Sequence, residues 1–341
     1  MDELEQSVER IALETRFSGV VRVDRGGVVE LARAYGLSDR AHGIPNTVDT
    51  QFGLASGTKG LTALAVVSLI EDGRLEPATT ARSVLGEDLP LIDAEVTVEH
   101  LLAHRSGIGD YLDEEEDYSP IDYVLAVPPH ELTTTERYLR VLDGHPMKFP
   151  PGKRFSYSNG GYAVLALIAE RVSGIAFPGL VKQRVSEPAG MGATEFLRSD
   201  ELPASAAFGY LESDGLRTNV FHLPVRGSGD GGIYSTVADV HALWTAFFDG
   251  RIVSPQWVSR MVHPHSDVPS ESRRYGLGFW LHQSSDHTVL LEGGDAGVSF
   301  RSVHDRSRSL TYTVISNTTR GARPVARHLD EVLGESLGLS Y

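Results

Sequence analysis

The stretch FGLASGTKGLTALAVVSLIEDG, residues 52–73, carries the strongest pattern in this sequence. A short apolar run changes at Ser56 into a helical pattern that continues to Asp72 and is closed by Gly73. Because apolar residues lie nearly all round this helix, we expect it to be central in the fold. Lys59 follows Ser56 by one turn and lies on the same helix face. A lysine is unusual in a buried helix, so this pair is a candidate functional site.

Ser56 stands at the expected start of this helix, where free N–H groups and the helix dipole stabilise developing negative charge. By itself, Ser-x-x-Lys is equally typical of a serine that caps a helix, followed by a solvated lysine. Lysine occurs only at positions 59, 148, 153 and 182, and only Lys59 has a serine three residues before it. The apolar surroundings favour a serine nucleophile with a lysine partner.

Further elements are predicted on both sides of this stretch. We expect helices at residues 3–15, 94–103, 134–142, 160–173, 236–249 and 321–336, and strands at residues 17–23, 28–35, 275–282, 288–291, 297–304 and 310–316. The first two strands flank a hairpin turn at residues 24–27. Because the strands lie at the two ends of the chain, the simplest closure pairs the N-terminal hairpin with the C-terminal strands in one antiparallel sheet.

This order predicts an α/β (α+β) fold, with an antiparallel sheet flanked by helices and a helical subdomain beside it. We assign residues 1–60 and 226–341 to the sheet domain and residues 61–225 to the helical subdomain. A site between the two parts is the default expectation. The sequence shows no internal repeat, low-complexity tract or Gly/Ser linker.

Two more motifs carry groups with useful chemistry. In Tyr157-Ser158-Asn159, a tyrosine hydroxyl can shuttle protons and an asparagine amide can hold a substrate amide, although a loop with an Asn helix cap has the same pattern. In LEGGDAGVS, residues 291–299, glycines at a strand edge allow a substrate backbone to come close, although a glycine turn between two strands has the same pattern.

Together the three motifs match, in order and spacing, the serine β-lactamase and penicillin-binding-protein superfamily. The sequence most resembles the class C branch, which includes esterases, D-amino-acid peptidases and D,D-carboxypeptidases. Similar stretches are HLLAHRSGI at residues 100–108, GGIYSTVAD at 231–239 and YGLGF at 275–279. The resemblance covers about residues 15–320 and implies a β-lactamase/transpeptidase-like fold.

The resemblance also implies roles for individual residues. Ser56 would be the acylated nucleophile, Lys59 and Tyr157 would share the acid and base work, and Asn159 would orient the substrate. Free lysine and tyrosine both titrate near pH 10, so Lys59 must be shifted by about 3 pKa units, on the order of 4 kcal/mol, to act as a base at neutral pH.

The third motif departs from the family pattern. The resemblance places Gly293 and Gly294 beside the substrate, with the Gly294 N–H joining that of Ser56 in an oxyanion hole. Where the family usually has a lysine or histidine, this sequence has Leu291, followed by Glu292. The missing cation puts β-lactamase and D,D-carboxypeptidase activity in doubt.

Composition excludes several function classes. A net charge of −15 argues against nucleic acid and anionic membranes as partners. The chain has no cysteine, which excludes disulfides and thiolate chemistry. No signal-peptide pattern is visible at the N-terminus, so we expect a cytoplasmic protein. No cofactor or metal is implied.

We interpret two polar features as parts of the scaffold or of the surface. His100 and His104 have the spacing of a zinc pair on a helix, but no third ligand is evident, so we interpret them as scaffold. Asp230 is interpreted as a surface aspartate rather than a residue of the cleft rim.

The predicted function is a serine hydrolase that acts through an acyl-enzyme on small ester, amide or peptide-like substrates. We favour an esterase or amidase. One alternative is a D-aminopeptidase, in which Glu292 or Asp295 meets a substrate ammonium; another is a D,D-carboxypeptidase or weak β-lactamase. An alternative of a different class is a non-hydrolytic binding protein that retains the fold.

Overall fold

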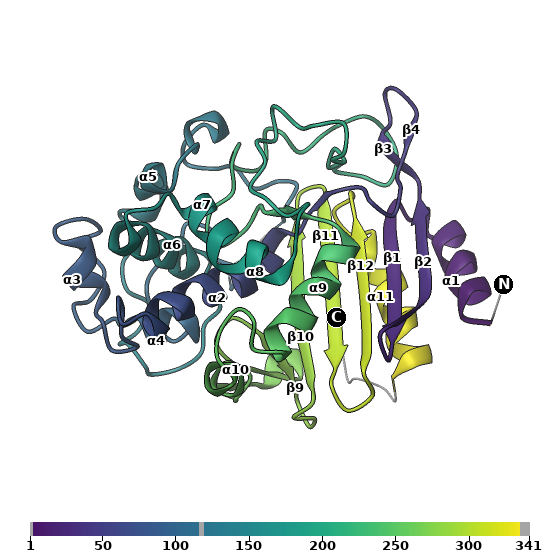
Figure 1. The fold of residues 1–341 in the computed structure, drawn as a ribbon. Coiled ribbons are helices and arrows are strands. Elements are labelled where there is room, and N and C mark those ends of the chain that lie inside the picture. Colours follow the sequence, from purple (N-terminus) through teal and green to yellow (C-terminus); the bar gives the residue numbers. More distant parts are fainter. Residues whose placement is uncertain (1–2, 116–118, 335–341) are drawn as a thin grey trace.

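The fold is built on an antiparallel sheet of eight strands in the order β2-β1-β12-β11-β10-β9-β8-β7 (Figure 1). It is seen in a computed structural model that describes residues 3–115 and 119–334. The strands are β1 (Gly19–Arg25), β2 (Val28–Tyr35), β7 (Ser266–Val268), β8 (Arg273–Tyr275), β9 (Trp280–His282), β10 (Thr288–Asp295), β11 (Val298–Asp305) and β12 (Leu310–Ser316). Because β1 pairs with β12 along its whole length, the predicted closure between the two ends of the chain is confirmed.

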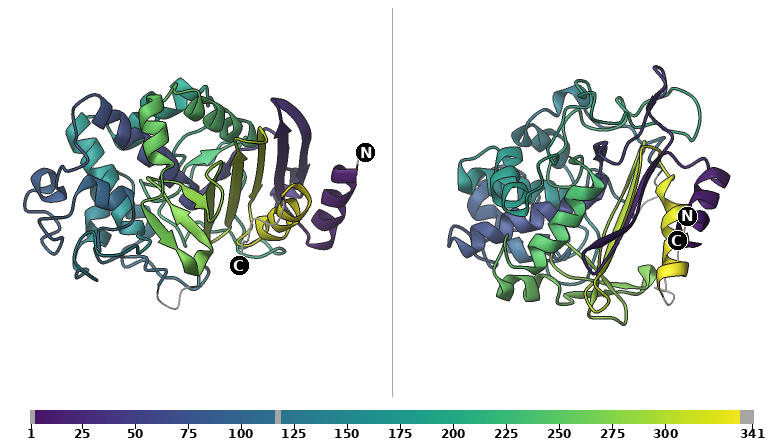
Figure 2. Two further views of the ribbon diagram at one scale, coloured as in Figure 1. Left: turned by 90° about the horizontal axis from the view of Figure 1, so that it is seen from below. Right: turned by 45° about the vertical axis from the view of Figure 1, so that its right-hand side comes forward.

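Helices cover both faces of this sheet (Figure 2). On one face lie α1 (Glu3–Glu14) and α11 (Ala322–Leu333), which contact each other, and α9 (Val237–Phe248) packs on the other face. Every residue of β12 is buried, as expected for a central strand covered on both sides. The α/β prediction with an antiparallel sheet flanked by helices is therefore confirmed.

The remaining helices gather beside the sheet (Figure 1). They are α2 (Thr58–Glu71), α3 (Ala81–Leu85), α4 (Val98–Leu102), α5 (Leu139–Leu142), α6 (Asn159–Ser173), α7 (Phe177–Val181), α8 (Glu187–Ala189) and α10 (Pro255–Met261). The α2 residues from Thr58 to Leu69 are all buried, and α2 packs against α6. The apolar helix recognised in the sequence is thus central, as predicted.

Two short strand pairs connect the parts. They are β3 (Leu37–Asp39) with β4 (Ile44–Pro45), and β5 (Phe52–Gly53) with β6 (Tyr234–Ser235). The second pair brings the segment before Ser56 against the segment after residue 230. The entry to α2 is thereby held beside a loop that is distant in sequence.

Some predicted elements differ in extent. The strand predicted at 275–282 is divided into β8 and β9, because Gly278 has a φ of +89° and the chain turns between Gly276 and Phe279. The helix predicted at 94–103 begins only at Val98, since the Thr97 side chain accepts a hydrogen bond from the His100 N–H and caps it there.

Strand β10 is longer than predicted and continues to Asp295, pairing with β11 as far as Val298. This extension runs beside η1 (Ala55–Gly57), the 3₁₀ turn that contains Ser56. A Cβ atom on Gly293 would lie 2.1 Å from the Leu54 carbonyl oxygen and 2.8 Å from the Ser56 nitrogen. The close approach of strand and turn therefore requires glycine at this position.

Among the described residues, no single helix is long and apolar enough to cross a membrane. Helix α6 and the segment Phe177–Ala189, bent by 82° relative to each other, pass that test only as a pair.

The two neighbouring glycines of β10 provide a matched pair of variants. Gly293→Ala should lower the free energy of unfolding by about 1–3 kcal/mol, because its methyl group overlaps backbone atoms that cannot move aside. Gly294→Ala should be nearly neutral, since no atom lies within 4 Å of the added carbon. Urea unfolding of both variants measures the difference, and equal losses would show that β10 does not approach η1 this closely.

Candidate active site

Ser56 lies in the tight turn that leads into α2. Ala55, the residue before it, has a φ of +45°, which is unusual for a residue with a side chain. The turn η1 then passes directly into α2 at Thr58, whose hydroxyl donates to the Ala55 carbonyl over 2.7 Å. The regular α-helix thus starts two residues later than predicted. The strained turn places the Ser56 side chain at the helix entrance, facing Lys59.

Lys59 is 2% exposed and makes three short hydrogen bonds. Its Nζ atom donates to Ser56 Oγ over 2.8 Å, to Asn159 Oδ1 over 2.8 Å and to the Asp230 carbonyl oxygen over 2.7 Å. Burial lowers the pKa of Lys59, while nearby carboxylates, Asp230 first among them, oppose the shift. The pKa moves in the direction that a lysine base requires.

Tyr157 contacts the same serine from another side. Its side chain is hydrogen-bonded to Ser56, and its ring stacks on Trp280 and lies 4.3 Å from the ring of His104. Burial raises the pKa of Tyr157 well above its ordinary value. The phenol therefore keeps its proton at neutral pH and is suited to pass that proton on rather than to act as a phenolate.

Asn159 begins α6, directly after the Ser158 cap. Its amide oxygen accepts from Lys59, and its amide nitrogen donates to the Leu112 carbonyl over 2.9 Å and to Glu114 over 3.0 Å. All three interactions are internal to the protein. In this structure Asn159 positions Lys59, and the predicted contact with substrate stays a prediction.

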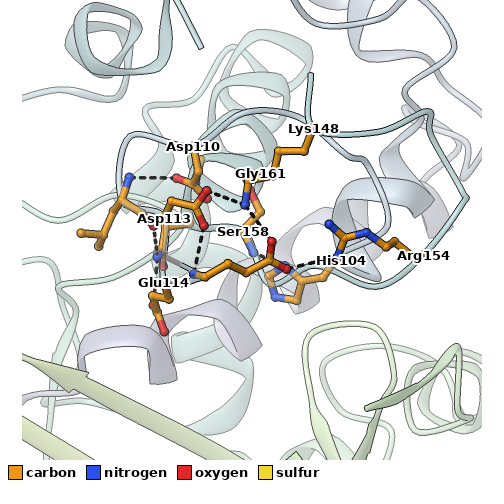
Figure 3. A network of polar contacts seen from close by, with 12 residues as sticks. His104, Asp110, Asp113, Glu114, Lys148, Arg154, Ser158 and Gly161 are labelled. Carbon is orange, nitrogen blue, oxygen red and sulfur yellow. Dashed lines mark hydrogen bonds and ion pairs between the residues drawn. The ribbon is translucent and has the colours of Figure 1, made fainter. Parts of the chain in front are cut away.

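Carboxylates crowd the region around Lys59. Asp110, on the loop after α4, accepts from the backbone N–H groups of Leu112 and Gly160, close to the start of α6 (Figure 3). Burial nevertheless raises the pKa of Asp110 to about 7. Burial also raises the pKa of Asp295 to about 7, against the positive charge of Lys59, and no hydrogen bond from the described residues reaches this carboxylate.

Asp230 corrects one of our interpretations. Its side chain is 8% exposed and accepts a hydrogen bond from the Tyr111 hydroxyl, while its carbonyl oxygen accepts from Lys59. The interpretation as a surface aspartate was therefore wrong. The burial arises because the loop that carries Tyr111 folds over residue 230, which no local pattern around Asp230 indicates.

The third motif is arranged differently from the expectation. Side chains alternate along β10, so Glu292 points away from the face on which Gly293 meets η1. The Glu292 carboxylate forms ion pairs with Arg273 and with Arg301, the latter over 3.1 Å. Although burial alone would raise it, the two guanidinium groups hold the pKa of Glu292 below its ordinary value. Glu292 is engaged here, so the predicted substrate contact for it is wrong.

Leu291 lies on the same face of β10 as Gly293 and packs against α2. It is 3% exposed, and its Cδ2 atom lies 2.6 Å from the point where a Cβ on Gly60 of α2 would stand. At the position where we expected the family's cation, β10 therefore makes an apolar contact with α2.

The two histidines behave as scaffold. The His104 ring is buried and accepts the Ser158 N–H over 3.0 Å at the start of α6 (Figure 3). His100 takes part in the cap of α4. Within the described ranges, no group of three potential ligands could hold a metal ion. His104 therefore orders the backbone next to Tyr157, and His100 orders the start of α4.

A cavity that is open to solvent lies beside Ser56. Asn159, Gly294 and three carboxylates, those of Glu114, Asp230 and Asp295, line it together with Ser56. None of its described lining residues is a lysine or an arginine. The structure thus brings Ser56, Lys59, Tyr157, Asn159 and Gly294 to one place and surrounds that place with acidic side chains.

Comparisons with known proteins agree with this arrangement. The family model described as Beta-lactamase matches residues 4–334. Among solved structures, a penicillin-binding protein from Bacillus halodurans is 33% identical, with a TM-score of 0.89 over 95% of this chain and 99% of that chain.

Two curated relatives show the range of activities among similar proteins. Esterase EstB of Burkholderia gladioli is 35% identical over 55% of this chain, and a D-aminopeptidase of Brucella anthropi is 28% identical over 94% of it. The matches span only 49% and 59% of the lengths of these two relatives.

The raised pKa of Asp295 predicts a dependence of stability on pH. A carboxyl whose pKa rises on folding, here from 3.8 to about 7, contributes stability that is full below pH 4 and is lost as the pH rises through 7. The loss from this group is at most about 4 kcal/mol. Asp295→Asn should therefore lose less stability than the wild type between pH 4 and pH 8.

Urea unfolding at several pH values tests this expectation. Asp267→Asn, at an exposed position of β7, is the matched control and should follow the wild type. A pH dependence that is the same in Asp295→Asn and the wild type would contradict the assigned shift.

Proposed function

This chain belongs to the beta-lactamase family, and from that premise we propose that it hydrolyses small esters or amides through an acyl-enzyme on Ser56. The observation that carries the proposal is the Lys59 amine, 2.8 Å from Ser56 Oγ and held by two further acceptors. The activity of a serine hydrolase is shared by its relatives; the roles given to the residues here are our proposal.

The geometry around Lys59 suits a base. A neutral amine has two N–H groups and one lone pair. If Asn159 Oδ1 and the Asp230 carbonyl accept the two N–H groups, the lone pair is directed at the hydroxyl of Ser56. Lys59 can then take the Ser56 proton as the oxygen attacks the substrate carbonyl carbon.

The remaining steps use groups around the same serine. The negative charge that develops on the carbonyl oxygen is stabilised by the N–H groups of Ser56 and Gly294; such a donor is typically worth about 2.7–4 kcal/mol. As the bond to the leaving group breaks, Tyr157 passes a proton to that group and receives in exchange the proton that Lys59 took from Ser56. Water then attacks the acyl-Ser56 carbonyl carbon and gives a proton to the neutral Lys59. The bond between that carbon and Ser56 Oγ breaks, the carboxylic acid leaves, and Lys59 returns the proton to Ser56 Oγ.

The charge of the cavity limits the substrate class. A substrate carboxylate beside the scissile bond would meet Glu114, Asp230 and Asp295 and no lining cation. The same carboxylates favour a second candidate function, the release of acyl groups that carry a protonated amine, as in an aminopeptidase. The Brucella anthropi relative, named D-aminopeptidase, supports this candidate.

The nucleophile and its partners are tested by labelling with a small fluorophosphonate. The adduct should map to Ser56 by peptide mass spectrometry and should be absent from Ser56→Ala. Lys59→Ala and Tyr157→Phe should each slow labelling at least about 100-fold. The double variant should be scarcely slower than either single variant, because groups that act as a unit are not additive. An adduct on another serine would contradict the assignment.

The charge preference is tested with three matched anilides of alanine, in both enantiomers. The free amine should give a higher kcat/KM than the N-acetyl compound, and the N-succinyl compound the lowest. We expect each step to be about tenfold, as for a charged contact worth about 1.4 kcal/mol. Asp295→Asn should reduce the differences in kcat/KM among the three compounds, and the control Asp267→Asn should leave them unchanged. A preference for the succinyl compound would refute an acidic binding site.

A further inference from the structure

We propose that the cavity beside Ser56 binds an apolar acyl group larger than acetyl, so that the preferred substrates are small esters or amides of medium-chain or arylalkyl acids rather than of acetate. The inference rests on the proposed function, since it assumes acylation of Ser56. It concerns the shape and lining of the site, which the family membership leaves open.

The size of the cavity is the first observation. The space beside Ser56 is a cavity open to solvent, lined by residues of several segments, and it extends beyond what an acetyl group would occupy.

The lining of the cavity is the second observation. Apart from the acidic side near Ser56, much of its wall is aliphatic, and these residues come from three separate segments: Leu112, Leu125, Leu197, Leu223, Pro224 and Val225. Four tyrosines also line the cavity, at positions 111, 123, 138 and 234, and the polar side chains of Ser199, Asn219 and His222 form the rest of the wall with several glycines.

Three of these tyrosines present carbon rather than oxygen to a ligand. The hydroxyl of Tyr111 donates to Asp230, that of Tyr123 to the Tyr111 carbonyl and that of Tyr138 to the Arg226 carbonyl. Because their polar ends are held by the protein, their rings add apolar area to the wall. The apolar character also continues outward: Val124 and Phe221, each next to a lining residue in the chain, are 83% and 82% exposed.

The position of Tyr157 indicates which half of the substrate lies in this cavity. Tyr157 contacts Ser56 but is not among the described lining residues, and its ring packs against Trp280 and His104. The group that leaves takes its proton from Tyr157 and so departs on that side. The acyl group, which stays bonded to Ser56 Oγ, is then directed toward the cavity.

The experiment compares p-nitrophenyl acetate, butyrate, hexanoate and 3-phenylpropionate. Each methylene buried against an apolar wall contributes up to about fourfold, so kcat/KM should rise at least tenfold from acetate to hexanoate. A second series holds the acetyl group constant and lengthens the alcohol. The inference is overturned if kcat/KM stays constant or falls as the acyl group lengthens. It is also overturned if kcat/KM rises only when the alcohol is lengthened.

Variants of lining residues test whether the apolar wall causes the preference for hexanoate over acetate. Leu223→Trp, which fills part of the cavity, should lower the ratio of hexanoate to acetate at least fivefold. Leu216→Trp, at a 63% exposed position outside the lining, should leave that ratio unchanged. Should Leu223→Trp fail to fold, Leu125→Gln gives a second test, since a polar side chain in the wall must also lower the ratio. An unchanged ratio in a folded wall variant overturns the inference.

A failure of this inference can be distinguished from a failure of the proposed function. Mass spectrometry of the trapped intermediate reports whether any ester acylates Ser56. If none does, the proposed mechanism fails; if acetate does so as readily as hexanoate, the mechanism stands and only the assignment of the acyl cavity is refuted.

Discussion

The buried amine of Lys59 is the constraint on which the arrangement of this protein depends. A charged or strongly polar group removed from water is costly unless all its hydrogens find acceptors. Here the acceptors come from three places: the turn before α2, the first residue of α6 and the backbone at residue 230. These segments must converge on one atom. The same contacts that offset the burial of Lys59 therefore fix the geometry of the candidate active site.

The carboxyl groups around Lys59 determine the charge of the site. They oppose the fall in the lysine pKa that burial causes, and burial in turn raises the pKa of Asp110 and Asp295 to about 7. The charge of the empty site therefore changes near neutral pH. A bound ammonium would favour the ionised carboxylates, whereas a neutral apolar group would leave them partly protonated. Both the charge and the apolar wall thus bear on the choice of substrate.

The fold and the reacting residues were largely predictable because their signals are local. The helix after Ser56 is apolar on every side, and the strands lie at the two ends of the chain. Asp230 could not be predicted, since its burial depends on Tyr111, which is 119 residues away in the sequence. The error at Glu292 was avoidable: alternation along a strand already places it opposite Gly293. Its arginine partners, from β8 and β11, could be found only in the structure.

The two faces of β10 carry different interactions. On one face Gly293 meets the Ser56 turn, and Leu291 packs against α2. On the other face Glu292 joins Arg273 and Arg301, and Arg301 also pairs with Asp330 of α11. The ion pairs of Glu292 hold β10 in place from one face. The opposite face, which carries Leu291 and Gly293, can therefore be apolar while the strand keeps its position. The acidic group at the end of β10 is Asp295, and because it lines the cavity beside Ser56, a substrate there meets a carboxyl group and no lysine or arginine among the described lining residues.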